Sequence, residues 1–310
     1  MTNDRRDDAL LELLRTLDGL GFDFVPPTPA THARVFARSE TGTGLRDLLG
    51  WSRVVPPDTL DAPIRKLLED ARVVEALPNG WRSSIRVARL RGRLFLHSAY
   101  PTEAGDAVFF GPDSYRFAEF IVAELARDSL CRNVVDVGTG SGVGLIVAAS
   151  LAQPARLAMT DINPAALRLA RINARHAGLE VEALHGCSLA GFDAPIDLAL
   201  ANPPFIIDAG DRAYRHGGGM LGAQVAVDMA RTIAERLNHN GRLLLYTGSA
   251  IVDGRDGLQA ELAKVIAEAD CTMRYLQLDP DVFGEELDLP AYRDAEVERI
   301  AIVGAVITRR

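Results

Sequence analysis

Two short stretches near the middle of the sequence, one rich in glycine and one ending in an acid, combine residue types that suit binding of a nucleoside. In Asp136-Val-Gly-Thr-Gly-Ser-Gly142, the glycines at 138, 140 and 142 let the backbone turn sharply and approach a ligand with no Cβ in the way. Asp161 ends an apolar stretch about twenty residues further on, where a carboxylate can accept hydrogen bonds from both hydroxyls of a ribose. Together, the two stretches predict a nucleoside site.

The glycine spacing restricts which nucleotide fits. A dinucleotide-binding loop has the pattern Gly-x-Gly-x-x-Gly, but Val143 stands three residues after Gly140. No Lys, Arg or Ser/Thr follows the loop in the manner of a phosphate-binding loop. A nucleoside without a phosphate therefore fits better, and a tight turn with no ligand is the alternative.

A third stretch, Asn202-Pro-Pro-Phe205, follows the apolar residues 196–201 and suits chemistry on a planar nitrogen. The side-chain oxygen of Asn202 and the carbonyl of Pro203 can both accept hydrogen bonds from one NH2 group, while Pro204 and Phe205 lie against its flat face. Such contacts leave the nitrogen electron-rich and aim its lone pair at a methyl sulfonium held over the glycine loop. The alternative is a Pro-Pro turn that only ends a strand.

A glycine-rich stretch from Arg212 to Gly222 comes soon after this motif. Its three consecutive glycines predict a flexible lid that orders over a substrate, with Tyr214, Arg215 or His216 in contact with it. A surface loop without a role is the alternative.

Alternating strands and helices must position these residues. Strands are expected at 133–138, 155–161, 180–185, 196–201, 242–247, 272–278 and 299–308, and helices at 143–151, 164–177, 220–238 and 255–269. This pattern predicts an α/β fold with a mostly parallel sheet and ligands at the carboxyl ends of its strands. About twenty residues without a clear long helix join the last two strands, which allows a final antiparallel strand.

The first hundred residues have a different pattern and predict a small separate α+β domain. Helices are expected at 5–20, 30–39, 43–51 and 60–71, followed by short strands at 72–77, 83–90 and 93–97. This is the order of a winged-helix domain, so we expect domains at 1–100 and 101–310. The hairpin contains Arg82, Arg86, Arg89, Arg91 and Arg93. They form either a basic surface for nucleic acid or an acidic protein, or a solvated strand face.

Composition excludes several classes of protein. The net charge of −8 at pH 7 argues against a global basic field that attracts nucleic acid. Cys131, Cys187 and Cys271 are scattered without a Cys-x-x-Cys pair, so we expect neither a disulfide framework nor a metal site. A charged N-terminus and the lack of a long apolar run predict a cytoplasmic protein with no membrane partner.

The motifs together resemble those of the class I S-adenosylmethionine-dependent methyltransferases. Asp136–Gly142, Asp161-Ile-Asn-Pro164 and Asn202-Pro-Pro-Phe205 are similar to the Asn-Pro-Pro-Tyr/Phe branch. That branch includes the glutamine methyltransferases of release factors and ribosomal proteins and the N6-adenine methyltransferases of RNA and DNA. Phe110-Gly-Pro-Asp-Ser-Tyr115 resembles a segment that helps cover the cofactor there. The resemblance spans roughly residues 108–310 and implies a Rossmann-like sheet.

The resemblance also implies roles for single residues. Asp136 and the loop Gly138–Gly142 would lie along the methionine part of S-adenosylmethionine, Asp161 would bind its ribose, and Ile162 would lie against the adenine. Where the family has an acid after the third strand, this chain has Gly186-Cys187-Ser188, and Ser188 would replace one hydrogen bond. The expected cofactor contacts are Asp136, Gly138, Thr139, Gly140, Gly142, Asp161, Ile162, Ser188 and Asn202.

The sequence thus predicts an S-adenosylmethionine-dependent N-methyltransferase with Asn202–Phe205 at its catalytic centre. A macromolecular acceptor, either a protein glutamine or an adenine of RNA or DNA, is favoured over a small amine or amide by the extra N-terminal domain. That domain does not match the helical recognition domain of the release-factor enzymes. A winged-helix regulator that only senses the cofactor is the non-catalytic alternative. A nicotinamide oxidoreductase is disfavoured by the glycine spacing.

Overall fold

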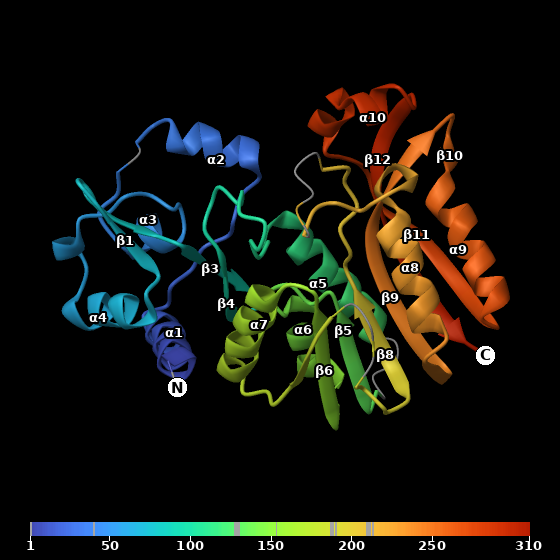
Figure 1. The fold of residues 1–310 in the computed structure, drawn as a ribbon, viewed down its shortest axis with the longest axis horizontal. Helices are drawn as coiled ribbons and strands as arrows, with labels where there is room; N and C mark the ends of the chain where they lie inside the picture. Colours follow the sequence, from blue (N-terminus) through green and yellow to red (C-terminus); the bar gives the residue numbers. More distant parts are fainter. Residues whose placement is uncertain are drawn as a thin grey trace. The chain divides into compact units, whose positions relative to one another are not determined.

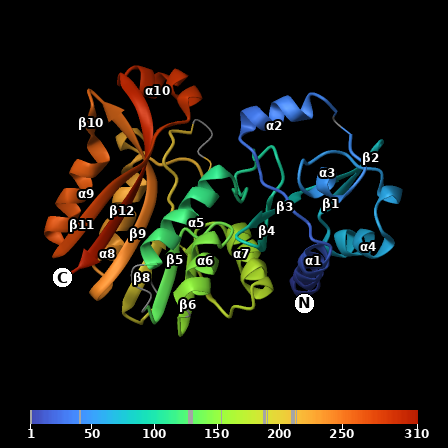
Figure 2. The same ribbon diagram turned by 180° about the vertical axis from the view of Figure 1, so that it is seen from behind.

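The computed structural model describes residues 2–39, 41–126, 131–152, 154–186, 189, 191–208, 212 and 214–310. The chain divides into two compact units (Figures 1 and 2). The first comprises Met1–Arg116, Gly140–Val143 and Arg168–Glu180, and the second comprises Phe117–Thr139, Gly144–Leu167 and Val181–Arg310. In the described part of the chain, no helix is both long and apolar enough to cross a membrane.

The first unit begins with helices and continues into two β-hairpins. Leu10, Leu14 and Leu17 recur at helical spacing on the first helix and are fully buried, as the sequence predicts. The elements are α1 (Thr2–Gly19), α2 (Pro29–Phe36), α3 (Leu45–Leu49), η1 (Pro57–Thr59), α4 (Ala62–Ala71), β1 (Val74–Leu77), β2 (Gly80–Ser83), β3 (Ile85–Leu90) and β4 (Arg93–Ser98). β1 pairs with β2 and β3 with β4, both antiparallel. The winged-helix assignment stays a prediction.

The arginines of β3 do not form the expected surface. Arg86 is only 4% exposed; its Nε donates to the carbonyl of Gly50 at 2.6 Å, and its guanidinium lies over the ring of Phe24. Arg89 pairs with Asp18 at 2.9 Å. Both the basic-surface and the solvated-face interpretations are therefore wrong for Arg86 and Arg89, because β3 is largely buried and both side chains bind the protein's own groups.

The second unit is organised around one large sheet with the strand order β11-β12-β9-β8-β5-β6-β7. The strands are β5 (Asn133–Val137), β6 (Arg156–Asp161), β7 (Glu182–His185), β8 (Ile196–Ala201), β9 (Leu237–Val252), β10 (Arg255–Asp256), β11 (Cys271–Val282) and β12 (Val297–Arg309). Strands β7, β6, β5, β8 and β9 are parallel neighbours, and β12 runs antiparallel to both β9 and β11. The predicted mostly parallel sheet with a final antiparallel strand is confirmed.

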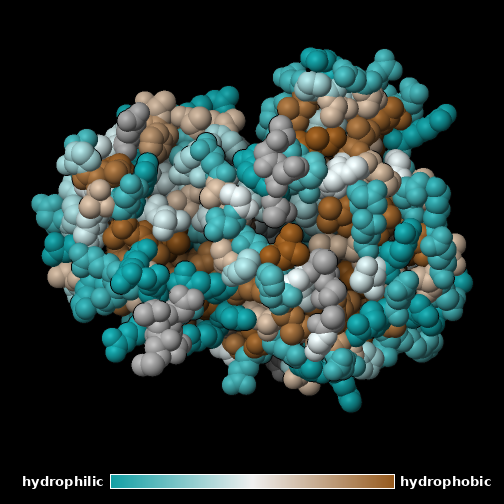
Figure 3. All heavy atoms as spheres, viewed as in Figure 1, coloured by the Kyte–Doolittle hydropathy of each residue, from teal (hydrophilic) through white to brown (hydrophobic). Residues whose placement is uncertain are grey.

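Helices cover both faces of this sheet. Leu243 and Leu245 of β9 point to the face where α8 and α9 pack, whereas Tyr246 points the other way, toward Phe117 of α5. This alternation is the period of two that a strand imposes. The helices are α5 (Pro112–Leu125), α6 (Val143–Ala152), α7 (Pro164–His176), η2 (Met220–Gly222), α8 (Gln224–Ala234), α9 (Gly257–Glu268), η3 (Gly284–Asp288) and α10 (Pro290–Arg293). Hydrophilic side chains dominate the surface seen in Figure 3, with apolar ones between them.

Several element boundaries differ from the sequence-based expectation, among them those of β9 and α8. β9 extends over Leu237–Val252 rather than 242–247, since its first residue already pairs with Ile196 of β8. α8 begins at Gln224 rather than at residue 220, because Leu221 has a non-helical positive φ of 54°. Residues 217–223 are thereby left outside the helix and next to the end of β8.

Candidate active site

The register of the parallel strands brings the three predicted stretches to one level of the sheet. Val137 of β5 pairs with Ala201 of β8 on one side and with Thr160 of β6 on the other. Gly138, Asp161 and Asn202 are the next residues along their strands. They therefore emerge together at the carboxyl edge of the sheet, where α/β proteins bind ligands.

Asp136 is buried at the end of β5, and its carboxylate organises the turn that follows. Its Oδ2 accepts hydrogen bonds from the Thr139 hydroxyl at 2.8 Å and from the backbone N–H of Leu145 at 3.0 Å. The carboxylate therefore ties the strand to the glycine loop and to the first turn of α6. The predicted contact of Asp136 with a cofactor stays a prediction.

Burial raises the pKa of Asp136 to about 6, against an opposing effect of the two hydrogen bonds. Because this pKa lies above that of the unfolded chain, the folded state binds the proton more tightly, and the cost of ionisation grows as the pH rises from about 4 to 6. In Asp136→Asn the side-chain oxygen can keep both hydrogen bonds without a charge. We expect the stability advantage of this variant over the wild type to grow by about 2 kcal/mol between pH 4.5 and 7.

Denaturant unfolding of both proteins across that range measures this difference, since other titrating groups are shared. A stability difference that stays constant with pH would contradict the assignment. Asp253→Asn, which removes a charge at an exposed position just after β9, serves as a control for a charge change that leaves the buried turn intact.

The glycine loop has the backbone that its sequence predicts. Gly138, Gly140 and Gly142 have φ angles of 70°, 56° and 85°, which residues with a Cβ rarely adopt. The N–H groups of Gly138 and Thr139 both donate to the carbonyl of Thr160, at 2.9 and 3.0 Å. Among the residues that the structure describes, none has an atom within 4 Å of the position of a Cβ at Gly140, so these residues leave room for a ligand to approach that backbone.

Gly144 is a closely packed glycine beside Asp136 that the sequence motifs do not include. A Cβ there would lie 2.9 Å from Oδ2 of Asp136 and 2.9 Å from the ring of Phe117. Only glycine lets α6 come this close to the buried carboxylate. A glycine in the first turn of an otherwise apolar helix is the sequence signal that could have identified it.

The end of β6 combines a carboxylate with an exposed apolar side chain. Oδ1 of Asp161 accepts a hydrogen bond from the N–H of Asn163 at 2.9 Å, and its carbonyl accepts one from Gly186 at 2.9 Å. Ile162 is 53% exposed, which is unusual for a large β-branched side chain. An acid beside an open apolar surface suits a ribose and its base. Cys187 and Ser188 lie outside the described residues.

Asn202 stands at the end of β8 with its side chain half-buried and, among the described residues, without a hydrogen-bond partner. Pro203 and Phe205 are buried, and Pro204 is half-buried. The amide of Asn202 is thus held on a rigid turn with its hydrogen-bonding capacity unused by the rest of the described chain. This is what an acceptor-binding group needs.

The ring of Phe205 is fixed by two residues that the sequence did not indicate. A Cβ at Gly248 of β9 would lie 2.2 Å from this ring, so the ring lies directly against bare backbone. On another side the ring of Phe283 approaches edge-on, with 5.7 Å between centroids. Phe205 therefore anchors the motif inside the protein.

The glycines of the following loop serve close packing. A Cβ at Gly217 would lie 2.0 Å from the carbonyl oxygen of Gly222 and 2.8 Å from the Cα of Phe205, and one at Gly222 would lie 2.3 Å from the Phe205 carbonyl oxygen. Gly217 also donates to the carbonyl of Ile206 at 2.9 Å. The expectation of a flexible run of three glycines does not fit Gly217, because its backbone packs directly on the motif, and the backbone of Gly222 packs there as well.

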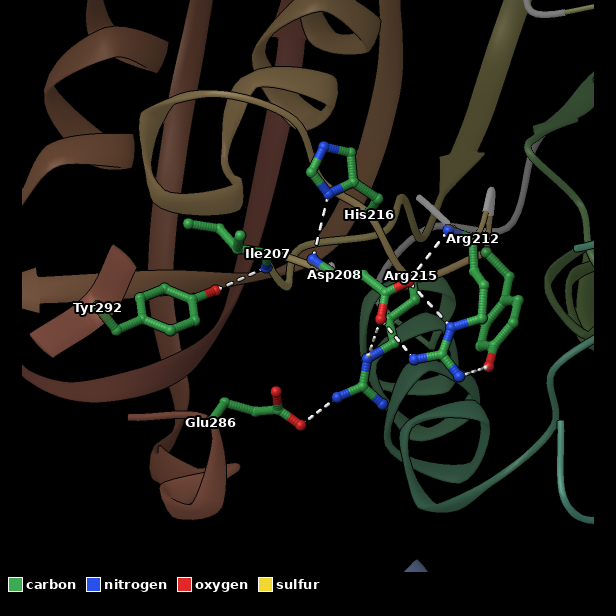
Figure 4. Close-up of polar contacts among 8 residues, drawn as sticks. Ile207, Asp208, Arg212, Arg215, His216, Glu286 and Tyr292 are labelled. Atoms are coloured by element: carbon green, nitrogen blue, oxygen red, sulfur yellow. Dashed lines mark hydrogen bonds and ion pairs between the residues drawn. The ribbon is translucent and has the colours of Figure 1, made fainter. Parts of the chain in front are cut away.

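The three predicted substrate contacts lie in this loop and have partners within the protein (Figure 4). Nδ1 of His216 accepts a hydrogen bond from the N–H of Asp208 at 3.1 Å, and Arg215 pairs with Asp208 and Glu286. The hydroxyl of Tyr214 accepts a hydrogen bond from Arg212 at 3.3 Å. The role of Tyr214, Arg215 and His216 toward a substrate stays a prediction.

The strand order and the position of the three motifs at one edge of the sheet agree with a Rossmann-like methyltransferase fold. Residues 116–265 match the family described as "Methyltransferase small domain". This segment is therefore a methyltransferase domain, which confirms the resemblance found in the sequence.

Curated relatives include glutamine methyltransferases. The chain is 32% identical over 169 residues to the release factor glutamine methyltransferase of Deinococcus radiodurans, covering 54% of this chain and 53% of that protein. It is 30% identical over 145 residues to the ribosomal protein uL3 glutamine methyltransferase of Neisseria gonorrhoeae, covering 43% and 47%. The chain thus spans about half the length of these curated relatives.

A solved structure supports the fold. Trm5b from Pyrococcus abyssi aligns with a TM-score of 0.51 at 13% sequence identity, over 79% of this chain and 68% of that chain. At this identity the similarity concerns the fold alone.

Proposed function

We propose that this protein is an S-adenosylmethionine-dependent methyltransferase that methylates the side-chain amide nitrogen of a glutamine in another protein. The observation that carries the proposal is the position of Asn202-Pro-Pro-Phe205, level with the glycine loop on the neighbouring strand. The names of the relatives from Deinococcus radiodurans and Neisseria gonorrhoeae support glutamine as the acceptor residue.

The residues at the carboxyl edge suit S-adenosylmethionine, which when bound supplies an electrophilic methyl group on a sulfonium centre. The positive φ angles of the loop glycines and the open space at Gly140 admit a ligand close to the backbone. Asp161 would hold the ribose hydroxyls, and the exposed Ile162 would cover one face of the adenine. Ser188 is proposed as a further contact with the cofactor.

Asn202 and Pro203 bind the acceptor in this proposal. The Asn202 side-chain oxygen and the Pro203 carbonyl accept both N–H groups of the glutamine amide, which concentrates electron density on its nitrogen and aims the lone pair at the methyl group. Pro204 lies against the amide plane, and Phe205 fixes the turn. After transfer the cationic amide nitrogen loses a proton to water, so the protein needs no strong general base.

The acceptor class is tested by transfer of a labelled methyl group from S-adenosylmethionine. The probes are a purified bacterial release factor, ribosomal proteins L11 and uL3, total RNA, DNA and a set of small amides. We expect label in a protein probe, at a glutamine by mass spectrometry. Label confined to RNA or DNA would contradict glutamine as the acceptor and indicate adenine in its place. If no probe is labelled and the protein still binds S-adenosylmethionine, the result would contradict the enzyme and favour the regulator that only senses the cofactor.

The remaining proposals concern the whole chain. We propose that residues 1–100 recognise the macromolecular acceptor, that residues 101–310 form the catalytic part, and that the protein works in the cytoplasm, where translation factors are found. Tyr214, Arg215 and His216 are proposed to line the acceptor side of the site.

A further inference from the structure

The connection between β11 and β12 contacts the segment that follows Asn202-Pro-Pro-Phe205, although the two lie about eighty residues apart in the sequence. The hydroxyl of Tyr292 accepts a hydrogen bond from the backbone N–H of Ile207 at 2.9 Å. Glu286 forms an ion pair with Arg215 (Figure 4). The Phe283 ring meets Phe205 itself. Each contact holds a different point of the segment.

Asp208 is the centre of the ionic part of this contact. Its side chain is only 5% exposed and accepts hydrogen bonds at Oδ2 from Arg212 Nε at 2.9 Å and from the Arg212 backbone N–H at 3.0 Å. Nε of Arg215 lies 3.4 Å from its Oδ1. The hydrogen bonds from Arg212 lower the pKa of Asp208 to about 2, so the carboxylate stays ionised at neutral pH. Arg215 therefore bridges two carboxylates, Asp208 on its own loop and Glu286 on the connection.

The backbone conformation of Phe283 is unusual and fits a role in positioning the segment around Phe205. Its φ of 54° and ψ of 40° are left-handed, a conformation that is rare for a bulky residue and that the surrounding structure must maintain. It directs the chain from β11 into η3, where Glu286 lies. Tyr292 follows in α10 and is fully buried.

These contacts lie outside the hydrophobic core cluster of the sheet. They reach Asn202–Phe205, called the acceptor motif below, and the loop that follows it. We propose that the β11–β12 connection is a positioning element for the methyl acceptor, with Glu286 and Tyr292 as positioning residues that hold Asn202–Phe205 in its productive orientation. This inference rests on the proposed function. Displacement of a reacting group by about 1 Å can lower a rate by about 10²-fold, so a modest loosening has a measurable effect.

The test compares Glu286→Ala with Glu285→Ala, its exposed neighbour of the same residue type. With the release factor as acceptor probe, we expect Glu286→Ala to lower kcat about tenfold and Glu285→Ala to leave it unchanged. The dissociation constant for S-adenosylmethionine should stay within about twofold in both variants. Glu286→Gln keeps an oxygen for Arg215 and should recover part of the lost kcat.

A second measurement does not depend on activity. Tyr292→Phe keeps the buried ring but removes the oxygen that accepts from Ile207, so amide hydrogen exchange at residue 207 should become at least about tenfold faster. If exchange accelerates as expected but no probe is methylated by the wild type, the proposed function fails and the contact stands. Equal kcat in Glu286→Ala and Glu285→Ala, or parallel losses in kcat, cofactor affinity and Tm, would overturn the positioning role.

Discussion

Replacement of Asn202 by alanine is expected to lower kcat for methyl transfer by about 10²–10³-fold, the cost of losing one preorganised hydrogen-bonding group at a reacting centre. The amide of Asn202 is free of partners among the described residues, so alanine removes an interaction with the acceptor and leaves no group of the described chain unsatisfied. Labelled methyl transfer to the protein probe at saturating S-adenosylmethionine measures the effect.

The Asn202 variant also separates catalysis from folding and from cofactor binding. Because the side chain is half-buried and makes no hydrogen bond within the described chain, its removal should change the free energy of unfolding by no more than about 0.5 kcal/mol. Asn202→Asp retains an oxygen acceptor and should keep more activity than the alanine variant. Normal turnover by Asn202→Ala would remove the motif from the mechanism.

The position of the site could be predicted because it depends on short motifs and on one rule of parallel sheets. Each of Gly138, Asp161 and Asn202 directly follows an apolar run of strand type, and the carboxyl ends of parallel strands lie at one edge. The register Val137–Ala201 then places the glycine loop and the acceptor motif side by side. The common edge needed no long-range information, whereas the adjacency of the glycine loop and Asn202–Phe205 is a long-range pairing that only the fold shows.

The supporting contacts could not be predicted because they join residues that lie far apart in the sequence. Gly248 directly follows the strand that the sequence predicts at 242–247, and only the fold shows that the Phe205 ring lies against it. The predicted surface position of Arg86 was wrong for the same reason, since its burial depends on the carbonyl of Gly50 and the ring of Phe24. Arginine side chains are mostly exposed in proteins, and here the tertiary partners of Arg86 override this tendency.

Gly217→Ala is the second change with a large expected effect. The added Cβ would meet the carbonyl oxygen of Gly222 at 2.0 Å and the Cα of Phe205 at 2.8 Å, and both are backbone atoms that cannot turn aside. The loop and the acceptor motif must then move apart. We expect a destabilisation of about 3 kcal/mol, at the upper end for overpacking, and at least about a tenfold loss of methyl transfer.

Gly219→Ala is the matched control, two residues along the same run of glycines. A Cβ at Gly219 would come no closer than 3.8 Å to any described neighbour, and neither Gly217 nor Gly219 has a positive φ, so the two substitutions differ in steric contact and not in backbone strain. If the run were a flexible lid, both variants would stiffen it alike and their activities would fall together. If Gly217 packs against the motif as the structure shows, Gly219→Ala keeps near wild-type stability and turnover while Gly217→Ala loses both. Thermal unfolding and methyl transfer on the pair therefore decide between a hinge and a packing contact.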